Sequence, residues 1–160
     1  MHHALIDPLE PWLDRRMIAH SYACRRGQGQ HRALGRARQL IRRHEWFLKL
    51  DVRAFFPSLR HDIVLDTLRR VVKDQRTLQL AEVIIRSGGS DSTGLPIGHL
   101  TSQWFANLVL DRLDHQVTEE MRAPGYLRYM DDFVLFADTK AWLREAHGRV
   151  AEHLTGIGLT

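Results

Sequence analysis

The stretch that decides the fold is YLRYMDDFVLF, residues 126–136, in which two apolar runs meet at the adjacent acids Asp131 and Asp132. Tyr, Leu, Met, Phe and Val favour strands with a half-buried surface, so the stretch is predicted to form a hairpin. A tight hairpin turn usually takes Asn-Gly or Asp-Gly, whereas here two like charges lie side by side. A solvated turn is the ordinary explanation of one Asp-Asp pair. Carboxylates next to a core instead require nearby cations, either metal ions or Arg side chains.

A second acid ends the strand predicted over residues 46–51. In the sequence WFLKLDVRAFFPS, residues 46–58, strand alternation places Asp51 on the less buried face. Phe55 and Phe56 then precede Pro57, which brings two rings close to the Asp51 carboxylate. The structural alternative is an Asp that only caps the following segment.

The length and composition suit one compact domain with a core of its own, because 44% of the 160 residues are hydrophobic. No apolar run approaches the ~20 residues needed to cross a bilayer, and the first residues lack the pattern of a signal peptide. We therefore expect a cytoplasmic protein that does not engage a membrane. Cys24 is the only cysteine, which excludes an internal disulfide and a Cys-based zinc site.

The net charge of +4 is unevenly distributed. Residues 15–44 contain nine Arg and no acidic residue, while the rest of the chain has 14 basic and 19 acidic residues. Such a block is typical of a surface that contacts phosphate, and a solvated basic helix is the alternative. Gly27 and Gly29, beside Arg25, form a flexible loop whose amides could surround a triphosphate, unless it is an ordinary loop before a helix.

Hydrophobic periodicity predicts helices over residues 31–44, 61–72, 74–86, 101–122 and 139–155. The first of these should pack through Leu34, Ala37, Leu40 and Ile41. The segment LPIGHLTSQ, residues 95–103, should turn at Pro96 and Gly98 and begin a helix capped by Thr101 or Ser102.

Three motifs occur in a fixed order: LDVRAFF at 50–56, LPIGHLTSQ at 95–103 and YMDD at 129–132. This combination resembles the palm motifs of the reverse transcriptases, and residues 25–31 look like the fingers motif of that family. The resemblance implies an α/β (α+β) polymerase palm, with strands at 46–51, 126–130 and 133–137 in a small antiparallel sheet backed by helices. One domain is expected, with partial fingers over about residues 1–44, the palm over about 45–160, and no thumb.

The resemblance implies an RNA-directed DNA polymerase that adds deoxynucleotides to a primer 3′-hydroxyl with two Mg²⁺ ions ~4 Å apart, or Mn²⁺ in their place. Asp51 and Asp131 would bridge the metals, with Asp132 in support and the Val52 carbonyl contributing. Phe55, or alternatively Phe56, would select deoxynucleotides by blocking a 2′-hydroxyl. The nucleotide would also contact Arg25, Ile97, Gly98 and Gln103. The RNA template and the DNA or RNA primer would contact Arg36, Arg42, Arg43, Tyr129 and Met130.

The middle motif narrows the resemblance. Most reverse transcriptases have Gln where this chain has Ile97 and Pro where it has Gln103. The Ile-Gly-x-x-x-Ser-Gln form looks like the enzymes of diversity-generating retroelements, which copy RNA with errors at template adenines and work with a small helical-bundle accessory protein. A Gln at position 97 could hydrogen-bond the incoming nucleotide and an Ile cannot, so geometric discrimination should relax there.

An inactive fragment that only binds nucleic acid or an accessory protein is the competing hypothesis, because the sequence stops before the next motif of the family. Both hypotheses predict a basic surface. Only the polymerase predicts a metal-dependent step that the loss of one carboxylate abolishes. An RNA-templated RNA polymerase and a palm-like nucleotide cyclase are disfavoured by Phe55 and by the Ser-Gln pair, respectively.

Overall fold

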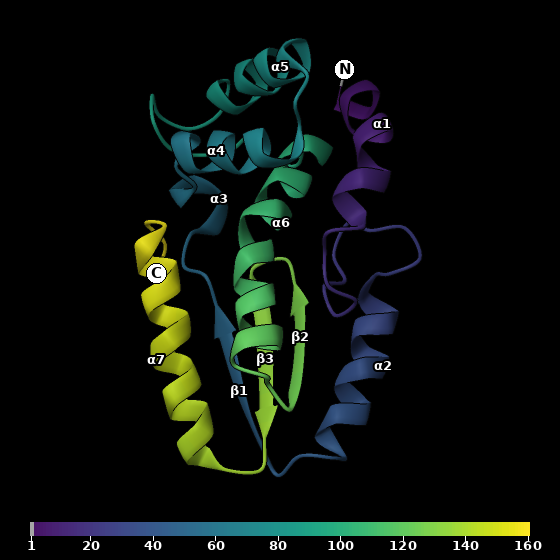
Figure 1. Ribbon diagram of the computed structural model, residues 1–160, viewed down its shortest axis with the longest axis vertical. Coiled ribbons are helices and arrows are strands. Elements are labelled where there is room, and N and C mark those ends of the chain that lie inside the picture. Colours follow the sequence, from purple (N-terminus) through teal and green to yellow (C-terminus); the bar gives the residue numbers. More distant parts are fainter. Residues whose placement is uncertain (1) are drawn as a thin grey trace.

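The computed structural model describes residues 2–160 (Figure 1). Its elements, in chain order, are α1 (His2–Asp14), α2 (Gln30–Ile41), β1 (Trp46–Asp51), α3 (Phe55–Ser58), α4 (His61–Val71), α5 (Gln75–Arg86), α6 (Leu100–His115), the π-helical turn η1 (Gln116–Glu120), β2 (Gly125–Tyr129), β3 (Asp132–Ala137) and α7 (Lys140–Gly156). The predicted fold class, a small antiparallel sheet combined with helices, is confirmed.

The three strands form one antiparallel sheet in the order β1-β3-β2, so the last strand in sequence lies in the middle. In this register Asp51 of β1 is paired with Asp132 of β3, and Tyr129 of β2 is paired with the same residue. Paired residues project their side chains from the same face of a sheet. The register therefore brings Asp51 and Asp132 to one face at one end of the sheet.

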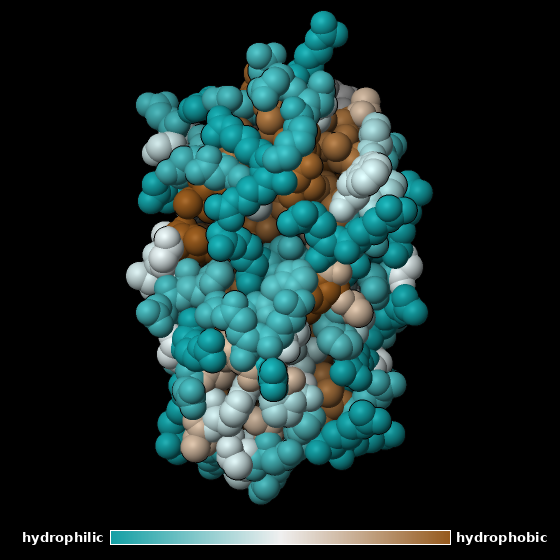
Figure 2. Space-filling view, viewed as in Figure 1, coloured by the Kyte–Doolittle hydropathy of each residue, from teal (hydrophilic) through white to brown (hydrophobic). Residues whose placement is uncertain are grey.

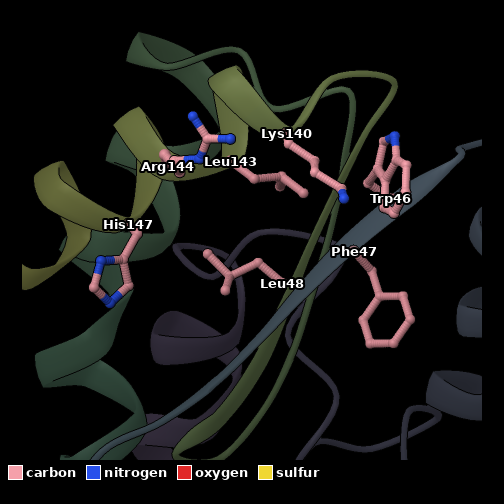
Figure 3. Close-up of a pocket in the computed structure, with 7 residues that line it drawn as sticks. All are labelled: Trp46, Phe47, Leu48, Lys140, Leu143, Arg144 and His147. Carbon is pink, nitrogen blue, oxygen red and sulfur yellow. The ribbon is translucent and has the colours of Figure 1, made fainter.

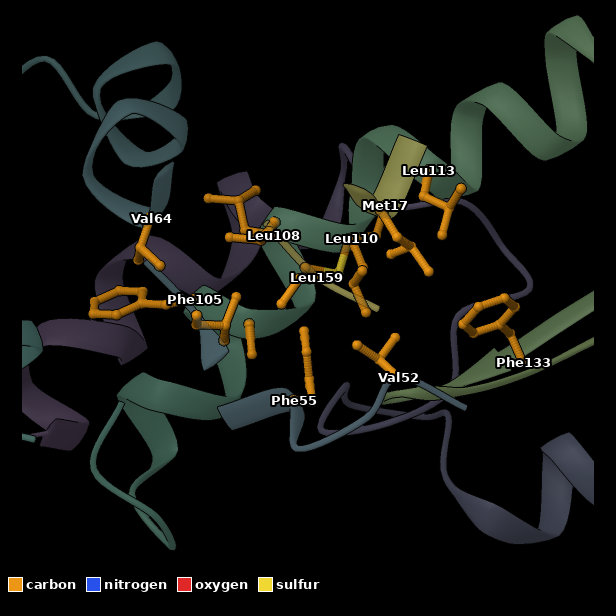
Figure 4. Close-up of a cluster of buried hydrophobic side chains, with 14 of the residues drawn as sticks. Met17, Val52, Phe55, Val64, Phe105, Leu108, Leu110, Leu113, Phe133 and Leu159 are labelled. Atoms are coloured by element: carbon orange, nitrogen blue, oxygen red, sulfur yellow. The ribbon is translucent and has the colours of Figure 1, made fainter. Parts of the chain in front are cut away.

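Helices α6 and α7 cover one face of the sheet, and α2 lies against β2 on the other (Figure 1). Helix α6 is buried on almost all sides, which makes it the central element of the core. Figure 4 shows Leu110 and Leu113 of this helix in the same cluster as Phe133 of β3. Because α2 covers only part of its face, Phe47 and Asp51 of β1 remain exposed there.

Helix α2 packs through a narrower face than its periodicity predicts. Ala33 and Leu40 are buried against Leu127 and Phe136 of the sheet, together with Tyr22, and Ala37 is partly buried there. Leu34 and Ile41, which we predicted to pack, are 56% and 59% exposed. The prediction was wrong for these two because α2 touches the sheet along one line of residues only, and the positions beside that line face solvent.

The start of α6 also differs from the expected one. The helix begins at Leu100 with His99 as its N-cap, and no side chain caps it. Thr101 and Ser102, the predicted caps, are buried, and the Thr101 hydroxyl lies 2.9 Å from Nδ1 of His2. Helix α7, by contrast, has a side-chain cap, since Thr139 accepts a hydrogen bond from the Trp142 amide.

The surface in Figure 2 is mostly hydrophilic, and hydrophobic atoms show chiefly in the seams between helices. Within residues 2–160, no helix has the length and apolar composition that a membrane span requires.

Candidate active site

The hairpin of β2 and β3 ends in a two-residue turn made by Met130 and Asp131. Met130 has a positive φ of 57°, a backbone conformation that normally favours glycine. The Asp131 carbonyl accepts a hydrogen bond from the Val52 amide at 3.3 Å, which joins the tip of the hairpin to the chain that leaves β1. The turn is thereby held beside Asp51.

Three acidic residues lie at this end of the sheet. Asp51 and Asp132 are direct cross-strand partners, and Asp131 precedes Asp132 in the turn. Burial raises the pKa of the Asp131 carboxyl above its usual value, and the negative charges of Asp51 and Asp132 raise it further. The structure thus places the three acids that the sequence singled out at one end of the sheet, where their charges act on one another.

The cation in the described conformation is Lys49. Its Nζ lies 2.8 Å from Oδ1 of Asp132, and this bond raises the pKa of the Lys49 ammonium. Within residues 2–160, no three His, Cys, Asp or Glu side chains lie close enough together to hold a metal ion. The donors near the turn are carboxylate and carbonyl oxygens, the ligands that Mg²⁺ prefers, so the donor chemistry fits that metal.

The loop before α6 is fastened to the segment that follows Asp51. The Leu95 amide donates to the Phe56 carbonyl at 3.0 Å, and the Gly94 amide donates to the Leu59 carbonyl at 2.8 Å. Gly94 has a φ of 96°, and a Cβ there would lie only 2.8 Å from Cα of Gly89. These contacts hold the middle and first motifs side by side.

At the outer side of this loop, Ile97 is 74% exposed and Gly98 has a φ of 84°. Gln103 is half-buried in the first turn of α6. Their predicted contacts with a nucleotide stay predictions.

The predicted role of Phe55 in selecting deoxynucleotides has to be corrected. Its side chain is only 2% exposed and points into the core near Val52 (Figure 4), where a nucleotide could not reach its ring. Phe56 is partly exposed, and the two ring centroids are 5.5 Å apart. The alternative left open by the sequence, Phe56, is therefore the better candidate for contact with the sugar.

The predicted contact of Arg25 with the nucleotide also has to be corrected. Its side chain is 6% exposed, and its Nε donates to Oδ1 of Asp14 at 2.6 Å. Its Nη1 donates to the carbonyls of Ile18 and Ser21. This guanidinium holds its own loop together and is not free to bind a triphosphate, whereas the side chain of Arg26 is 82% exposed and pairs with Glu10.

The predicted template and primer contacts differ in accessibility. Arg42 and Arg43 are exposed just after α2, while Arg36 is half-buried. Burial and the charge of Arg36 together lower the pKa of His20. Tyr129 is 40% exposed and Met130 is half-buried. Their contacts with template and primer stay predictions.

A broad groove lies away from the acids. It has a volume of about 650 Å³ and is lined by β1 and α7 (Figure 3), through Trp46, Phe47, Leu48, Lys140, Leu143, Arg144 and His147. These β1 residues belong to the end of the strand opposite Asp51. Asp51 itself borders a smaller groove of about 260 Å³ along the last turns of α7.

Sequence reasoning missed a buried polar cluster behind the hairpin. Arg128 of β2 and Asp114 of α6 form an ion pair at 2.6 Å, and both side chains are fully buried. A charged residue inside an apolar strand and an acid inside an apolar helix were the available signals. Neither signal identifies its partner, because the two residues are 14 positions apart.

A neighbouring acid, Asp111, gives a prediction about pH. Burial raises the pKa of Asp111 to about 6; His115, 3.5 Å away, lowers it and Asp114 raises it. A folded-state pKa above the unfolded value near 3.9 favours the protonated form, so the cost to stability grows from about pH 4 and is complete above about pH 6. Asp111→Asn should therefore raise the free energy of unfolding by about 3 kcal/mol at pH 8 and have little benefit at pH 4.

Urea unfolding at both pH values measures this effect. Asp66→Asn, which changes an exposed acid in α4, is the control. A stabilisation of equal size at pH 4 and pH 8 would show that the charge of Asp111 is not its cause.

Comparisons with known proteins bear on the family and the fold of the chain. The family model described as reverse transcriptase (RNA-dependent DNA polymerase) matches residues 1–160. The retron Ec73 reverse transcriptase of Escherichia coli is 32% identical over 111 residues, which cover 61% of this chain and 34% of that protein. Nuclear intron maturase 1, mitochondrial, of Arabidopsis thaliana is 32% identical over 82 residues, covering 51% of this chain and 12% of that protein.

Among solved structures, apo telomerase from Candida tropicalis, truncated from the C-terminal domain, superposes with a TM-score of 0.69. The superposition covers 97% of this chain and 38% of that one at 12% identity, which supports the fold alone. The chain spans about a third or less of the length of these two relatives. Because the family model matches it from end to end, the chain belongs to the reverse transcriptase (RNA-dependent DNA polymerase) family.

Proposed function

We propose that the protein that contains this chain is an RNA-directed DNA polymerase, which transfers nucleotides from deoxynucleoside triphosphates to a primer 3′-hydroxyl along an RNA template. The observation that carries the proposal is the placement of Asp51, Asp131 and Asp132 at one end of an open sheet face. Nucleotidyl transfer needs concentrated negative charge that binds divalent cations at an accessible surface. The three acids at this exposed end of the sheet would supply both.

Asp51, Asp131 and the Val52 carbonyl would hold two Mg²⁺ ions, or Mn²⁺, with Asp132 in support. When bound, these ions supply positive charge to the transferring phosphoryl group. Lys49 holds Asp132 in place in the described conformation. Phe56, the more accessible of the two rings after Asp51, would contact the sugar and oppose a 2′-hydroxyl.

The nucleic acid would lie over the open face. Arg42 and Arg43 project from the end of α2, with Tyr129 and Met130 next to the acids. These Arg side chains would contact backbone phosphates, and the affinity should then fall as salt rises. This electrostatic contact positions the template and carries no sequence preference.

Primer extension on an RNA template by the complete gene product tests the proposal. Extension that needs Mg²⁺ and deoxynucleotides supports it. Retained RNA binding without any extension would support the second candidate, a module that only binds nucleic acid or an accessory protein. The exposed Leu34 and Ile41 among the Arg residues of α2 are the observation that favours this candidate.

The finer proposal is that copying is error-prone, as in diversity-generating retroelements, and that a small helical-bundle protein assists it. Support comes from Ile97, whose exposed side chain lies in the loop fastened to Phe56. An apolar side chain there offers no hydrogen bond to an incoming nucleotide.

Ile97→Gln should improve fidelity several-fold, because a new polar contact contributes about 1 kcal/mol of discrimination. The gain should be largest opposite template adenine. The measurement is misincorporation by the complete gene product on a defined RNA template, with Mg²⁺ and all four deoxynucleotides. Ile97→Val is the matched control. An unchanged error spectrum in an active variant would show that Ile97 does not set fidelity.

A further inference from the structure

We infer that Arg128 is a positioning residue that sets the conformation of the Met130–Asp131 turn and thereby aims the Asp131 carboxylate. Its kinetic consequence rests on the proposed polymerase function, whereas its structural consequence does not. Arg128 touches no part of the open face, because its side chain is wholly buried on the α6 side of the sheet.

The contact that carries the inference joins Arg128 to the turn. Its Nη1 donates to the Met130 carbonyl at 2.9 Å. Met130 has a φ of 57°, which a non-glycine residue adopts only when its surroundings impose it. The carbonyl that Arg128 holds belongs to the peptide that links Met130 to Asp131. Fixing that peptide fixes the direction in which the Asp131 side chain leaves the backbone.

Arg128 is itself held by α6. Its Nε donates to Oδ1 of Asp114 at 2.8 Å and its Nη2 to Oδ2 of the same residue at 2.6 Å. Its Nη1 also donates to Oδ1 of Asn107 at 2.8 Å, and the hydroxyl of Tyr126 donates to Asp114. Two residues of one rigid helix therefore fix the plane of the guanidinium. The guanidinium then fixes the conformation of the Met130–Asp131 turn.

A third segment locks the backbone of Arg128. Its amide donates to the His20 carbonyl at 2.9 Å, and its carbonyl accepts from the Tyr22 amide at 3.0 Å. The Asn107 amide group donates to the Ala23 carbonyl in the same segment. The turn that carries Asp131 is thus connected through hydrogen bonds to the centre of the fold as well as to its two strands.

The ion pair with Asp114 alone would satisfy the buried charge, so the bond to Met130 is a separable feature. A guanidinium serves Asp114, Asn107 and Met130 at once because its donors are spread in one rigid plane, and an ammonium cannot reproduce that fork. Arg128→Lys therefore keeps the charge next to Asp114 while it loses the hold on the turn.

The first readout is hydrogen exchange of the Val52 amide, which reports on its bond to the Asp131 carbonyl. In Arg128→Lys, this exchange should become about tenfold faster relative to amides in α6, as expected for local opening of the turn. Adding Met130→Gly should restore much of the protection, because glycine adopts a positive φ without strain. Val64→Ala, a core truncation in α4, is the control for lost stability.

Two further readouts use the proposed chemistry. The affinity for Mn²⁺, titrated without substrate, should fall about tenfold in Arg128→Lys. The kcat for primer extension should fall about 10²-fold, because a small misplacement of a reacting group is costly. The KM for deoxynucleotides should stay within about twofold of the wild-type value. Met130→Gly in the same background should recover part of the kcat. A merely structural role of Arg128 predicts that Val64→Ala, matched in Tm, gives the same losses.

The inference is overturned if Arg128→Lys leaves Val52 exchange unchanged, if Val64→Ala accelerates it equally, or if Met130→Gly gives no recovery. Failure of the proposed function has a different signature, in which the wild-type protein neither extends a primer nor binds Mn²⁺. The exchange of Val52 decides the positioning role in that case too.

Discussion

Asp131→Asn is expected to lower the rate of primer extension about 10³-fold while the protein stays folded, because an amide removes the charge that holds a divalent cation next to the transferring phosphate. Burial and the charges of Asp51 and Asp132 raise the pKa of Asp131. A raised pKa means that the ionised carboxylate costs stability at neutral pH, so the neutral Asn should leave the Tm unchanged or slightly higher.

The measurement is single-turnover extension by the complete gene product, paired with a thermal melt. Asp62→Asn is the matched control and should retain the wild-type rate. It changes an exposed acid of α4 that pairs with Arg60. Extension at the wild-type rate by Asp131→Asn would exclude Asp131 from the chemistry.

The largest effect on stability is expected for Asp114→Ala. This change leaves the fully buried guanidinium of Arg128 without its carboxylate and the Tyr126 hydroxyl without its acceptor. Removing one partner of a buried ion pair costs about 3–5 kcal/mol, which in a domain of this size lowers the Tm by about 10 °C.

Asp66→Ala is the matched control, because it removes one partner of an exposed pair with Arg69 and should cost less than about 1 kcal/mol. Unfolding in urea, followed by circular dichroism, measures both variants. Equal losses would show that burial does not decide the contribution of the Arg128–Asp114 pair.

The sequence predicts the elements around the site because their signals are local. Strand alternation and the apolar runs on either side of Asp131 define the hairpin, and the same alternation places Asp51 at the end of β1. Pairing Asp51 with Asp132 then follows from the antiparallel register. The convergence of these acids was therefore within reach of the sequence.

What the sequence could not give are contacts between distant residues. Arg25 is neutralised by Asp14, which lies just outside the acid-free block. Phe55 and Phe56 are equivalent in the sequence, and only the direction of the chain after β1 decides which ring enters the core. The exposure of Leu34 and Ile41 depends on how α2 docks, which no periodicity specifies.

The position of β1 at the margin of the sheet has a consequence for handling the chain in solution. One side of β1 has no hydrogen-bonded neighbour among residues 2–160, and the strand begins with Trp46 and Phe47, which are 36% and 64% exposed. An exposed edge strand with aromatic side chains can pair with a strand of another molecule, and charged residues oppose this pairing. Lys49 is the cation on this strand, so its pairing with Asp132 also weakens the protection against self-association in concentrated samples.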